Sequence, residues 1–474
     1  MATPTPPPLP PAPSPLSGTA AEQTVSCFRR LFGTTFKVGL IGLLTLILLI
    51  PLAKIESLLH ERLERRNAAV AEITATWGRA QELVGPVLVV PYRKQVKVVR
   101  QELVAGVRQN IEALETVTAQ ACFLPADLAV AGTLAPERRY RGIYEAVVYR
   151  GDLTLSGHFT KPDFTEWKVA AADVLWEDAT ITLAITDLRG IQEELTLKLG
   201  DRTLPLLPGC RLAGFGSGVS ARLGKEAGAA ERLPFELALS LNGSSGIRVA
   251  PLGQRTEAKL QSPWPDPSFT GAFLPATRTV SAKGFEAAWQ VFHYGRAFPQ
   301  QWNDESRPDR DLLKQSLFGV ELISPVDHYR LVERAIKYGI LFVVLAFTAF
   351  FLFEVLTKRR IHPFQYTLVG VALCLFYLAL LALSEVVGFG PAYLAGAAVA
   401  TLLVGFYCAG FLGGAGRGLL VSAGLAAVYG FLYIVLMLQD YSLVAGTVGL
   451  FAVLFLLMLA TRRVDWYARD QEKG

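Results

Sequence analysis

Two carboxylates, Glu354 and Glu385, stand inside or beside long apolar runs, where an ionised group could do chemistry. An ionised side chain within a bilayer is costly unless it is paired, so such residues mark functional sites by default. Both lie near the end of their run, where headgroups and water are within reach. Their position argues against a proton-coupled transporter or an ion channel, although backbone or hydroxyl sites for transport remain open.

A basic cluster follows Glu354. Lys358 comes four residues later, which is the spacing of an ion pair along one helix face. The other members of the cluster are Arg359, Arg360 and His362. The cluster could bind an anionic lipid or a protein partner. Alternatively, it only fixes the orientation of the adjacent spans, and Pro363 begins the next helix.

A second polar group lies just before the second long apolar run. Its members are Asp327, His328 and Arg334. Apolar residues recur at helical spacing through this stretch and predict one continuous helix, Val326–Tyr338, that enters the membrane. Such a helix could couple an extramembrane body to the membrane mechanically. Helix capping and interfacial anchoring explain the same residues equally well.

Motifs for catalysis and metal binding are missing. The chain has neither GxSxG nor HExxH and no Cys/His cluster, so we predict no catalytic, cofactor-binding or metal-binding residues and no nucleic-acid partner. The glycine-rich segment Arg211–Arg232 satisfies no phosphate-loop pattern and is interpreted as a flexible loop. Trp264 lies in a proline-rich segment as a buried anchor or an exposed ligand-stacking residue. Cys122 and Cys210 could form a disulfide, which sequence alone cannot establish.

The elements that must position these residues are six apolar runs in a chain that is 51% hydrophobic and 18% charged. A helix of about 20 apolar residues spans a bilayer. One run lies near the start, and five follow a long gap. The runs are Val38–Ala53, Tyr338–Leu356, Phe364–Leu383, Pro391–Phe411, Leu419–Leu438 and Ser442–Ala460.

The short loops between the runs differ in charge. Lys and Arg gather before the first run, between the second and third, between the fourth and fifth, and after the sixth. The opposite loops, Ser384–Gly390 and Gln439–Tyr441, contain neither residue type. By the positive-inside rule, both termini are cytosolic and the body encoded by the long gap lies on the other side.

The body begins with a helical stretch, Ile55–Trp77, and from Gly85 the apolar period changes to two. Alternation bounded by Gly, Asn and Asp predicts antiparallel strands in a β-sandwich-like arrangement. Phe123–Ala126 and Phe273–Ala276 share the sequence FLPA, and similar elements follow each copy. We interpret this as two related β-lobes; chance similarity of short motifs is the alternative.

Several long segments resemble the CreD family of inner-membrane cell envelope integrity proteins of Gram-negative bacteria. The segments are Gly319–Glu385, Leu83–Tyr92 (LVGPVLVVPY), Gly142–Phe159 (GIYEAVVYRGDLTLSGHF), Ser262–Gln290 and Val464–Ala468 (VDWYA). The resemblance implies a bacterial inner membrane protein with its large body in the periplasm. It also implies a link to envelope integrity and to a two-component regulon, and it supplies no catalytic residues.

We therefore predict an α+β membrane protein with six transmembrane helices and a β-rich periplasmic domain. Its predicted parts are a disordered tail (1–33), the first span (34–53), a helical stalk (54–84), two β-lobes (85–230 and 231–337, the second including the linking helix), a five-helix bundle (338–461) and a cytosolic tail (462–474). The expected function is non-enzymatic: envelope support or stress sensing, with the bilayer and an envelope or regulatory protein as partners. The alternatives are a membrane-anchored enzyme acting on an envelope polymer or lipid, and a transporter.

Overall fold

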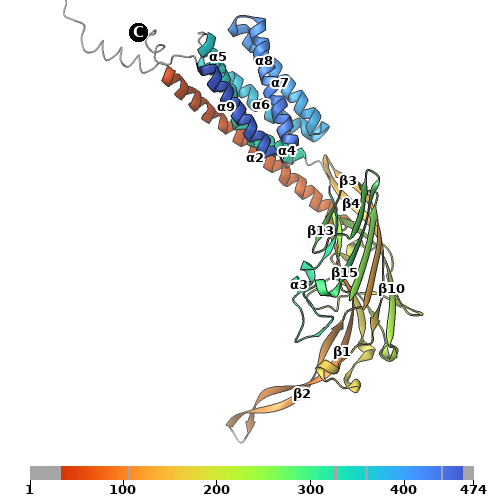
Figure 1. Ribbon diagram of the computed structural model, residues 1–474. Coiled ribbons are helices and arrows are strands. Elements are labelled where there is room, and N and C mark those ends of the chain that lie inside the picture. Colours follow the sequence, from red (N-terminus) through yellow and green to blue (C-terminus); the bar gives the residue numbers. More distant parts are fainter. Residues whose placement is uncertain (1–33, 105–106, 324–327, 358–360, 439–440, 463–474) are drawn as a thin grey trace, which may run out of the picture. The chain divides into compact units, whose positions relative to one another are not determined.

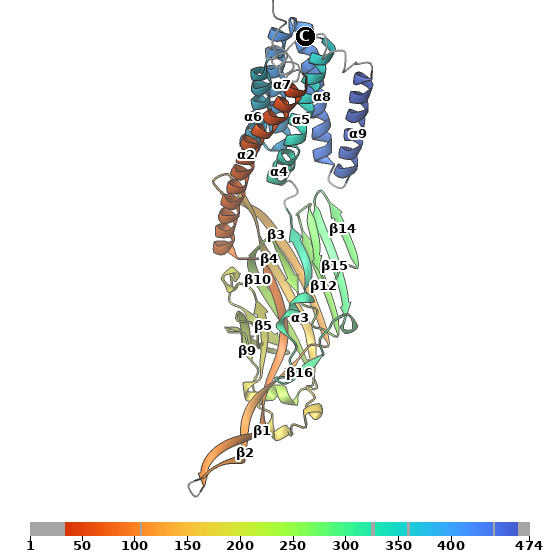
Figure 2. The ribbon, with the colours of Figure 1, turned by 90° about the vertical axis from the view of Figure 1, so that its left-hand side faces the viewer.

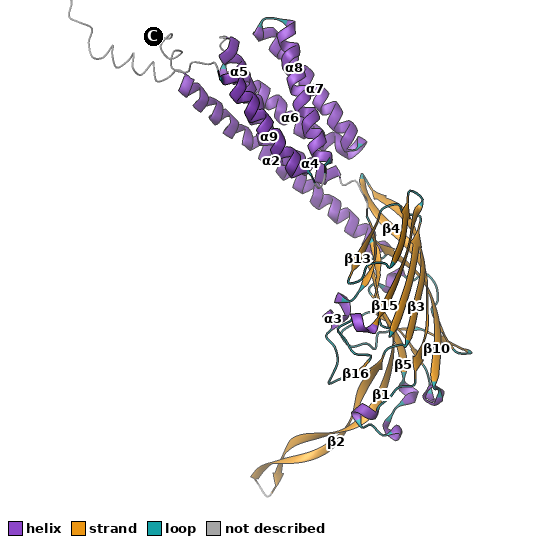
Figure 3. Cartoon of the chain, in the orientation of Figure 1, coloured by secondary structure: helices purple, strands orange, loops and turns teal. Residues whose placement is uncertain are grey.

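A computed structural model describes residues 34–104, 107–323, 328–357, 361–438 and 441–462. These residues form two compact units (Figures 1 and 3). The membrane unit contains residues 34–64 and 328–462, and the β unit contains residues 65–323. The predicted tails over 1–33 and 463–474 lie outside the described residues.

The membrane unit is helical. Its elements are the first part of α2 (Thr34–Trp77), α4 (His328–Lys337), α5 (Gly339–Thr357), α6 (Pro363–Val387), α7 (Phe389–Leu412), α8 (Ala415–Met437) and α9 (Ser442–Thr461), and the last turns of α2 belong to the β unit. Among the described residues, five helices are long and apolar enough to cross a membrane, and six if α4 and α5 count as one bent span. The prediction of a membrane protein that combines apolar helices with a β-rich region is confirmed.

Helix α2 continues well past the membrane-spanning length. The predicted first span and most of the predicted stalk are one helix of 44 residues. The helix ends at Trp77 because Gly78 has a φ of +146°, which favours glycine. A Cβ at Gly78 would also come within 2.6 Å of the Asn242 carbonyl oxygen. The last residues of the predicted stalk already belong to β1 (Gln81–Val104).

The predicted continuous helix Val326–Tyr338 is bent where it meets the next span. Its first residues lie outside the described part of the chain, and α4 and α5 form an angle of 44°. Gly339 follows the break, and a Cβ there would lie 3.2 Å from the Leu52 side chain and 3.4 Å from that of Tyr377. Close packing at a helix-weakening glycine therefore accompanies the bend.

The β unit contains two mixed sheets (Figure 2). The first sheet has the order β13 (Pro267–Gly271), β17 (Phe318–Leu322), β11 (Gly246–Val249), β1, β5 (Thr180–Ile185), β9 (Gly218–Arg222) and β8 (Leu207–Pro208), with β2 (Val107–Phe123) paired to β1 and β16 (Gln301–Asn303) to β2. The second has the order β14 (Thr277–Ser281), β15 (Gly284–Phe292), β12 (Arg255–Ser262), β3 (Asp127–Arg141), β4 (Tyr144–Thr160), β10 (Arg232–Ser244), β6 (Thr196–Leu199) and β7 (Arg202–Pro205).

The two predicted lobes are not separate bodies, because each sheet takes strands from both sides of residue 230. In the first sheet β1 lies parallel to β11, and each has an antiparallel partner, β5 and β17 respectively. In the second sheet β3 lies parallel to β12, with antiparallel partners β4 and β15. The segments before and after residue 230 thus contribute corresponding strands that lie side by side in the same sheet.

The second sheet buries one face, as the period-two pattern requires, whereas all six residues of β5 in the first sheet are buried. In β12, buried and exposed residues alternate along the whole strand. Buried side chains from both sheets, such as Leu88, Leu155 and Leu260, belong to one continuous hydrophobic cluster. The core of the β unit therefore lies between residues of both sheets.

Strands β1 and β2 extend beyond this core as a long hairpin (Figure 2). Their pairing runs from Leu88–Phe123 to Val104–Val107. On the other edge of β1, the ladder with β5 ends at Val89, and a single bridge joins Tyr92 to Val174. The outer part of the hairpin therefore pairs only with itself among the described strands.

Candidate functional site

The last turns of α2 are attached to the second sheet of the β unit. The Trp77 indole donates a hydrogen bond to the Tyr149 carbonyl oxygen at 3.3 Å. The Arg139 guanidinium carbon lies 3.8 Å from the centroid of the Trp77 ring, which is close enough for a cation–π contact. Glu72, one turn earlier, forms an ion pair with Arg141. Three different interactions thus fix the helix end on β3 and β4.

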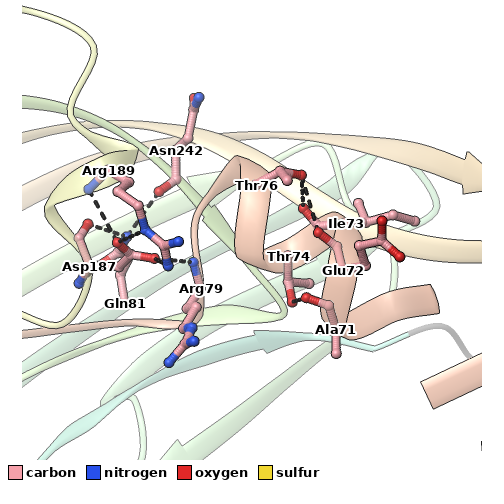
Figure 4. A network of polar contacts seen from close by, with 10 residues as sticks. All are labelled: Ala71, Glu72, Ile73, Thr74, Thr76, Arg79, Gln81, Asp187, Arg189 and Asn242. Carbon is pink, nitrogen blue, oxygen red and sulfur yellow. Dashed lines mark hydrogen bonds and ion pairs between the residues drawn. The ribbon is translucent and has the colours of Figure 1, made fainter. Parts of the chain in front are cut away.

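A buried polar network continues from this helix end into the first sheet (Figure 4). Gln81, at the start of β1, donates to the carbonyl oxygens of Asp187 at 3.2 Å and Asn242 at 3.0 Å. Its side-chain oxygen accepts from the Asp187 amide at 3.3 Å. The Gln81 side chain therefore joins β1 to the loop after β5 and to β10.

Asp187 collects the remaining donors of the network. Its carboxylate accepts from the Arg189 guanidinium at 2.9 and 2.8 Å and from the Arg79 backbone amide at 3.3 Å. Only 6% of the Asp187 side chain is exposed, whereas 57% of Arg189 is exposed. The hydrogen bonds from Arg189 lower the pKa of Asp187, and burial opposes them. Asp187 is therefore a buried anion that ties the chain between α2 and β1, through Arg79 and Gln81, to the loop after β5.

No sequence motif predicts this junction. Gly78 and the Asp187–Gly190 turn are its local signals, since Asp187 caps a short 3-10 helix and Gly190 lies against the Asn242 carbonyl. These signals indicate turns but do not reveal that the two turns meet.

At the loop end of α5, Glu354 has a partner that the sequence did not predict. Lys37 of α2 forms an ion pair with Glu354 and donates to the Ile361 carbonyl oxygen at 2.9 Å. The Tyr366 hydroxyl donates to the other carboxylate oxygen at 3.3 Å. The expected partner, Lys358, lies outside the described residues, as do Arg359 and Arg360.

His362 caps the next helix. Its ring nitrogen accepts from the Phe364 amide at 3.2 Å, and its own amide donates to the Gln365 side chain at 2.9 Å. With Pro363 in the first turn, this is a capping box at the start of α6. The contacts of His362 are those of a helix-start residue.

At the other end of α6, Glu385 has two partners. The Tyr329 hydroxyl donates to it at 3.0 Å, and Arg62 of α2 lies 3.7 Å away. His328 lies at the same end: a Cβ at Gly388 would be 3.5 Å from its ring. The Nδ1 atom of His328 is buried and has no hydrogen-bond partner among the described residues. Asp327 lies outside the described residues.

Arg334 contacts the end of α8. Its guanidinium lies 3.5 Å from the Val435 carbonyl oxygen and 3.4 Å from that of Leu438. Carbonyl groups in the last turn of a helix lack intrahelical donors, so a cation there is favourable. The structure thus brings His328 near Glu385 and places Arg334 and Glu354 in separate contacts.

Trp264, for which the sequence left a buried anchor and an exposed ligand-stacking residue open, is buried. Only 6% of it is exposed, and its indole donates to the Ile323 carbonyl oxygen at 2.9 Å. The alternative, a buried anchor, describes it correctly. Its proline-rich segment turns the ring inward, where the hydrophobic area of an indole is stabilising.

Cys122 and Cys210 are both free thiols in the structure. Burial raises the pKa of Cys122 to about 12, so this thiol is unreactive in the folded unit. Within the described part of the chain, no three His, Cys, Asp or Glu side chains are placed to hold a metal ion.

These features define a multi-pass membrane protein whose polar residues are paired near the span ends and which also contains a β unit that includes the last turns of α2. The family described as "Inner membrane protein CreD" matches residues 33–467. A protein of the same description from Escherichia coli (strain K12) is 34% identical over 427 residues, which cover 89% of this chain and 91% of that protein. The chain belongs to the CreD family and is an inner membrane protein that contacts the lipid bilayer.

Proposed function

We propose that this protein supports the integrity of the cell envelope, or the response to envelope stress, without acting as an enzyme. In this proposal the β unit lies in the periplasm, both termini are cytosolic, and the β unit binds a ligand or a protein partner. A regulatory or envelope protein is the expected class of protein partner.

The observation that carries the proposal is the junction between α2 and the β unit. The same helix that contains the first apolar span ends in the contacts of Trp77 and the network around Asp187. A rigid helix with buried, charge-assisted contacts at its end transmits force or rotation, which a flexible linker would absorb. A protein that relays the state of the envelope needs such a connection.

The membrane unit supports the same proposal. Glu354 and Glu385 are engaged with Lys37 and Tyr366, and with Tyr329 and Arg62, near the ends of their helices. These are contacts that hold helices together. They give α2 a fixed position against α5 and α6, as a helix that transmits a signal requires.

The test is complementation in a bacterium that lacks its own member of the family. The readouts are leakage of a periplasmic enzyme and sensitivity to detergent. We expect the wild-type chain to restore both, and the network variants Asp187→Asn and Gln81→Leu to restore neither fully at matched membrane levels. Asp163→Asn, at an exposed carboxylate of the same unit, is the control and should behave as wild type.

Two results would refute the proposal. One is a normal envelope in cells without the family member under every stress applied. The other is full restoration by both network variants, which would show that the junction is dispensable for the function.

A further inference from the structure

A pocket of about 220 Å³ lies on the first sheet of the β unit. Its walls come from β1, β5, the glycine-containing loop before β9 and the short helix α3 (Arg310–Gln315). Its lining residues include Glu82, Val84, Phe215, Ser217, Arg310 and Lys314. All of them belong to the β unit, and none belongs to the junction described above.

The pocket carries an excess of positive charge. Glu82 accepts a hydrogen bond from Arg248 at 2.7 Å and lies 3.4 Å from the Lys314 ammonium. These two cations already exceed the charge of the single carboxylate. Arg310 adds a third, and no carboxylate among the described residues pairs with it. Arg248 does not itself line the pocket, so the charged lining residues of the pocket are Arg310 and Lys314 against Glu82, which already pairs with Arg248.

Arg310 is held in place by an aromatic ring instead of an acid. Its guanidinium carbon lies 5.5 Å from the centroid of the Phe215 ring. The stem of Arg310 also lies against the loop, because a Cβ at Gly214 would be 3.4 Å from it. A stacked guanidinium keeps its hydrogen-bond donors free in the ring plane, where they match a carboxylate or phosphate group.

The loop that forms one wall is anchored to the sheet. The Ser217 carbonyl oxygen accepts from the Ile185 amide at 3.2 Å. Gly214 has a φ of +89°, a conformation that favours glycine, so this part of the glycine-rich segment has a defined shape. The segment lacks a phosphate-loop sequence pattern, but it contributes a wall to a pocket whose cations come from elsewhere in the chain.

We propose that this pocket binds the oxyanion group of a small organic acid. Arg310 and Lys314 receive the carboxylate or phosphate, and the side chains of Val84, Ala184 and Phe215 contact a short apolar portion of the ligand. The inference deepens the ligand-binding role proposed for the β unit, and its biological purpose rests on that proposal. The chemistry of recognition is the same for a carboxylic acid and for a phosphate monoester.

The test is calorimetric titration of the full-length protein in an uncharged detergent. The probes are butyrate and monobutyl phosphate, with butanol as the uncharged analogue. We expect one site for at least one of the two anions and no binding of butanol. The relative affinities of the two anions assign the ligand to the carboxylates or to the phosphate esters. Arg310→Ala and Lys314→Ala should each weaken binding at least tenfold, whereas Lys283→Ala, at an exposed turn, should change nothing.

Arg310→Lys keeps the positive charge but loses the planar guanidinium, so it should weaken binding less than Arg310→Ala does. If the alanine variant does not fold, Arg310→Lys serves as the test. No binding of either anion at millimolar concentration, equal binding of butanol, or unchanged affinity in the Arg310 and Lys314 variants would overturn the proposal. The envelope assay is scored separately from binding. If the pocket binds an anion but the chain does not restore the envelope, only the proposed function is refuted. If the chain restores the envelope but binds neither anion, only the proposal for the pocket is refuted.

Discussion

Asp187 shows how one buried side chain determines the local structure of the junction. It receives two hydrogen bonds from Arg189 and others from the backbone amides of Arg79 and Arg189. A carboxylate this buried is stable only with such partners, since desolvation of an unpaired ion is expensive. The exposed Arg189 can be solvated without Asp187, but Asp187 cannot be ionised in this position without its donors.

We predict that Asp187→Asn destabilises the protein by about 2 kcal/mol, because the charge-assisted hydrogen bonds are lost and a buried amide replaces the anion. Thermal unfolding in detergent measures the effect. Arg189→Ala should also destabilise the protein, because it leaves the buried Asp187 carboxylate without its two side-chain donors. An Asp187→Asn protein with wild-type stability would contradict the role given to this carboxylate.

The lowered pKa of Asp187 gives this contribution a pH dependence. The folded pKa is below the ordinary value, so the stabilisation is complete above about pH 4 and is lost as the pH falls through the folded pKa. We therefore predict that the difference in unfolding temperature between wild type and Asp187→Asn narrows below about pH 4. A difference that stays constant from neutral to acidic pH would show that the carboxylate is not the group responsible.

At this scale the sequence predicted types of residue better than contacts. Glu354 and Glu385 were identified because charge next to an apolar run is unusual, and the structure gives both of them polar partners. Asp187 was missed because a polar residue in a polar loop has no unusual neighbours. Its importance comes from Gln81 and Asn242, which are distant in sequence and close only after the sheets form.

At the scale of elements, the ion pair between Lys37 and Glu354 joins α2 to α5. We predict that Lys37→Met or Glu354→Gln lowers the unfolding temperature, each leaving one charge without its partner at a cost of about 3 kcal/mol. The exchange Lys37→Glu with Glu354→Lys should recover part of the loss. Recovery is partial because Lys37 also binds the Ile361 carbonyl and Tyr366 also binds Glu354.

The control for this ion pair is Lys54→Met on the same helix, at an exposed position, which should leave stability unchanged. Size-exclusion chromatography with a thermal ramp in detergent provides the measurement. If the exchanged pair is no more stable than the single variants, the contact between Lys37 and Glu354 does not position α2.

The helices and many strands of the chain follow from sequence periodicity, but the sheet order does not. Period-two alternation tells which face of a strand is buried, as in β10 and β12, and says nothing about which strands are neighbours. The parallel pairs β1–β11 and β3–β12 join segments far apart in the chain. The FLPA repeat indicated two related segments, yet it could not show that their strands share sheets.

In the proposed function, the continuous helix α2 carries the signal between the two units. Ala68 lies on an exposed side of α2, just beyond the end of the membrane unit. We predict that Ala68→Pro abolishes complementation of the envelope defect while both units stay folded. Unlike Pro51, which α2 accommodates within its apolar span, a proline at position 68 removes a helix hydrogen bond where water can compete, at a cost of about 3 kcal/mol. Ala68→Ser should retain function.

Limited proteolysis of the membrane fraction tests whether the β unit of Ala68→Pro remains compact, and a thermal ramp tests the membrane unit. A variant that is folded and restores the envelope as well as wild type would mean that α2 does not carry the signal between the units.

At the scale of the whole molecule, the charge asymmetry of the loops predicts that the β unit is periplasmic and that the loop between α7 and α8 is cytosolic. Cysteine labelling can test this with two exposed positions, Lys283→Cys in the β14–β15 turn and Gly416→Cys at the start of α8. We expect an impermeant maleimide to label the first once the outer membrane is opened, and the second only after the inner membrane is opened.

The background carries Cys27→Ser and Cys210→Ser, whereas Cys122 can remain because its buried thiol is unreactive. Labelling in the opposite order would place the β unit in the cytosol, and an envelope role for its pocket and its junction would then be untenable.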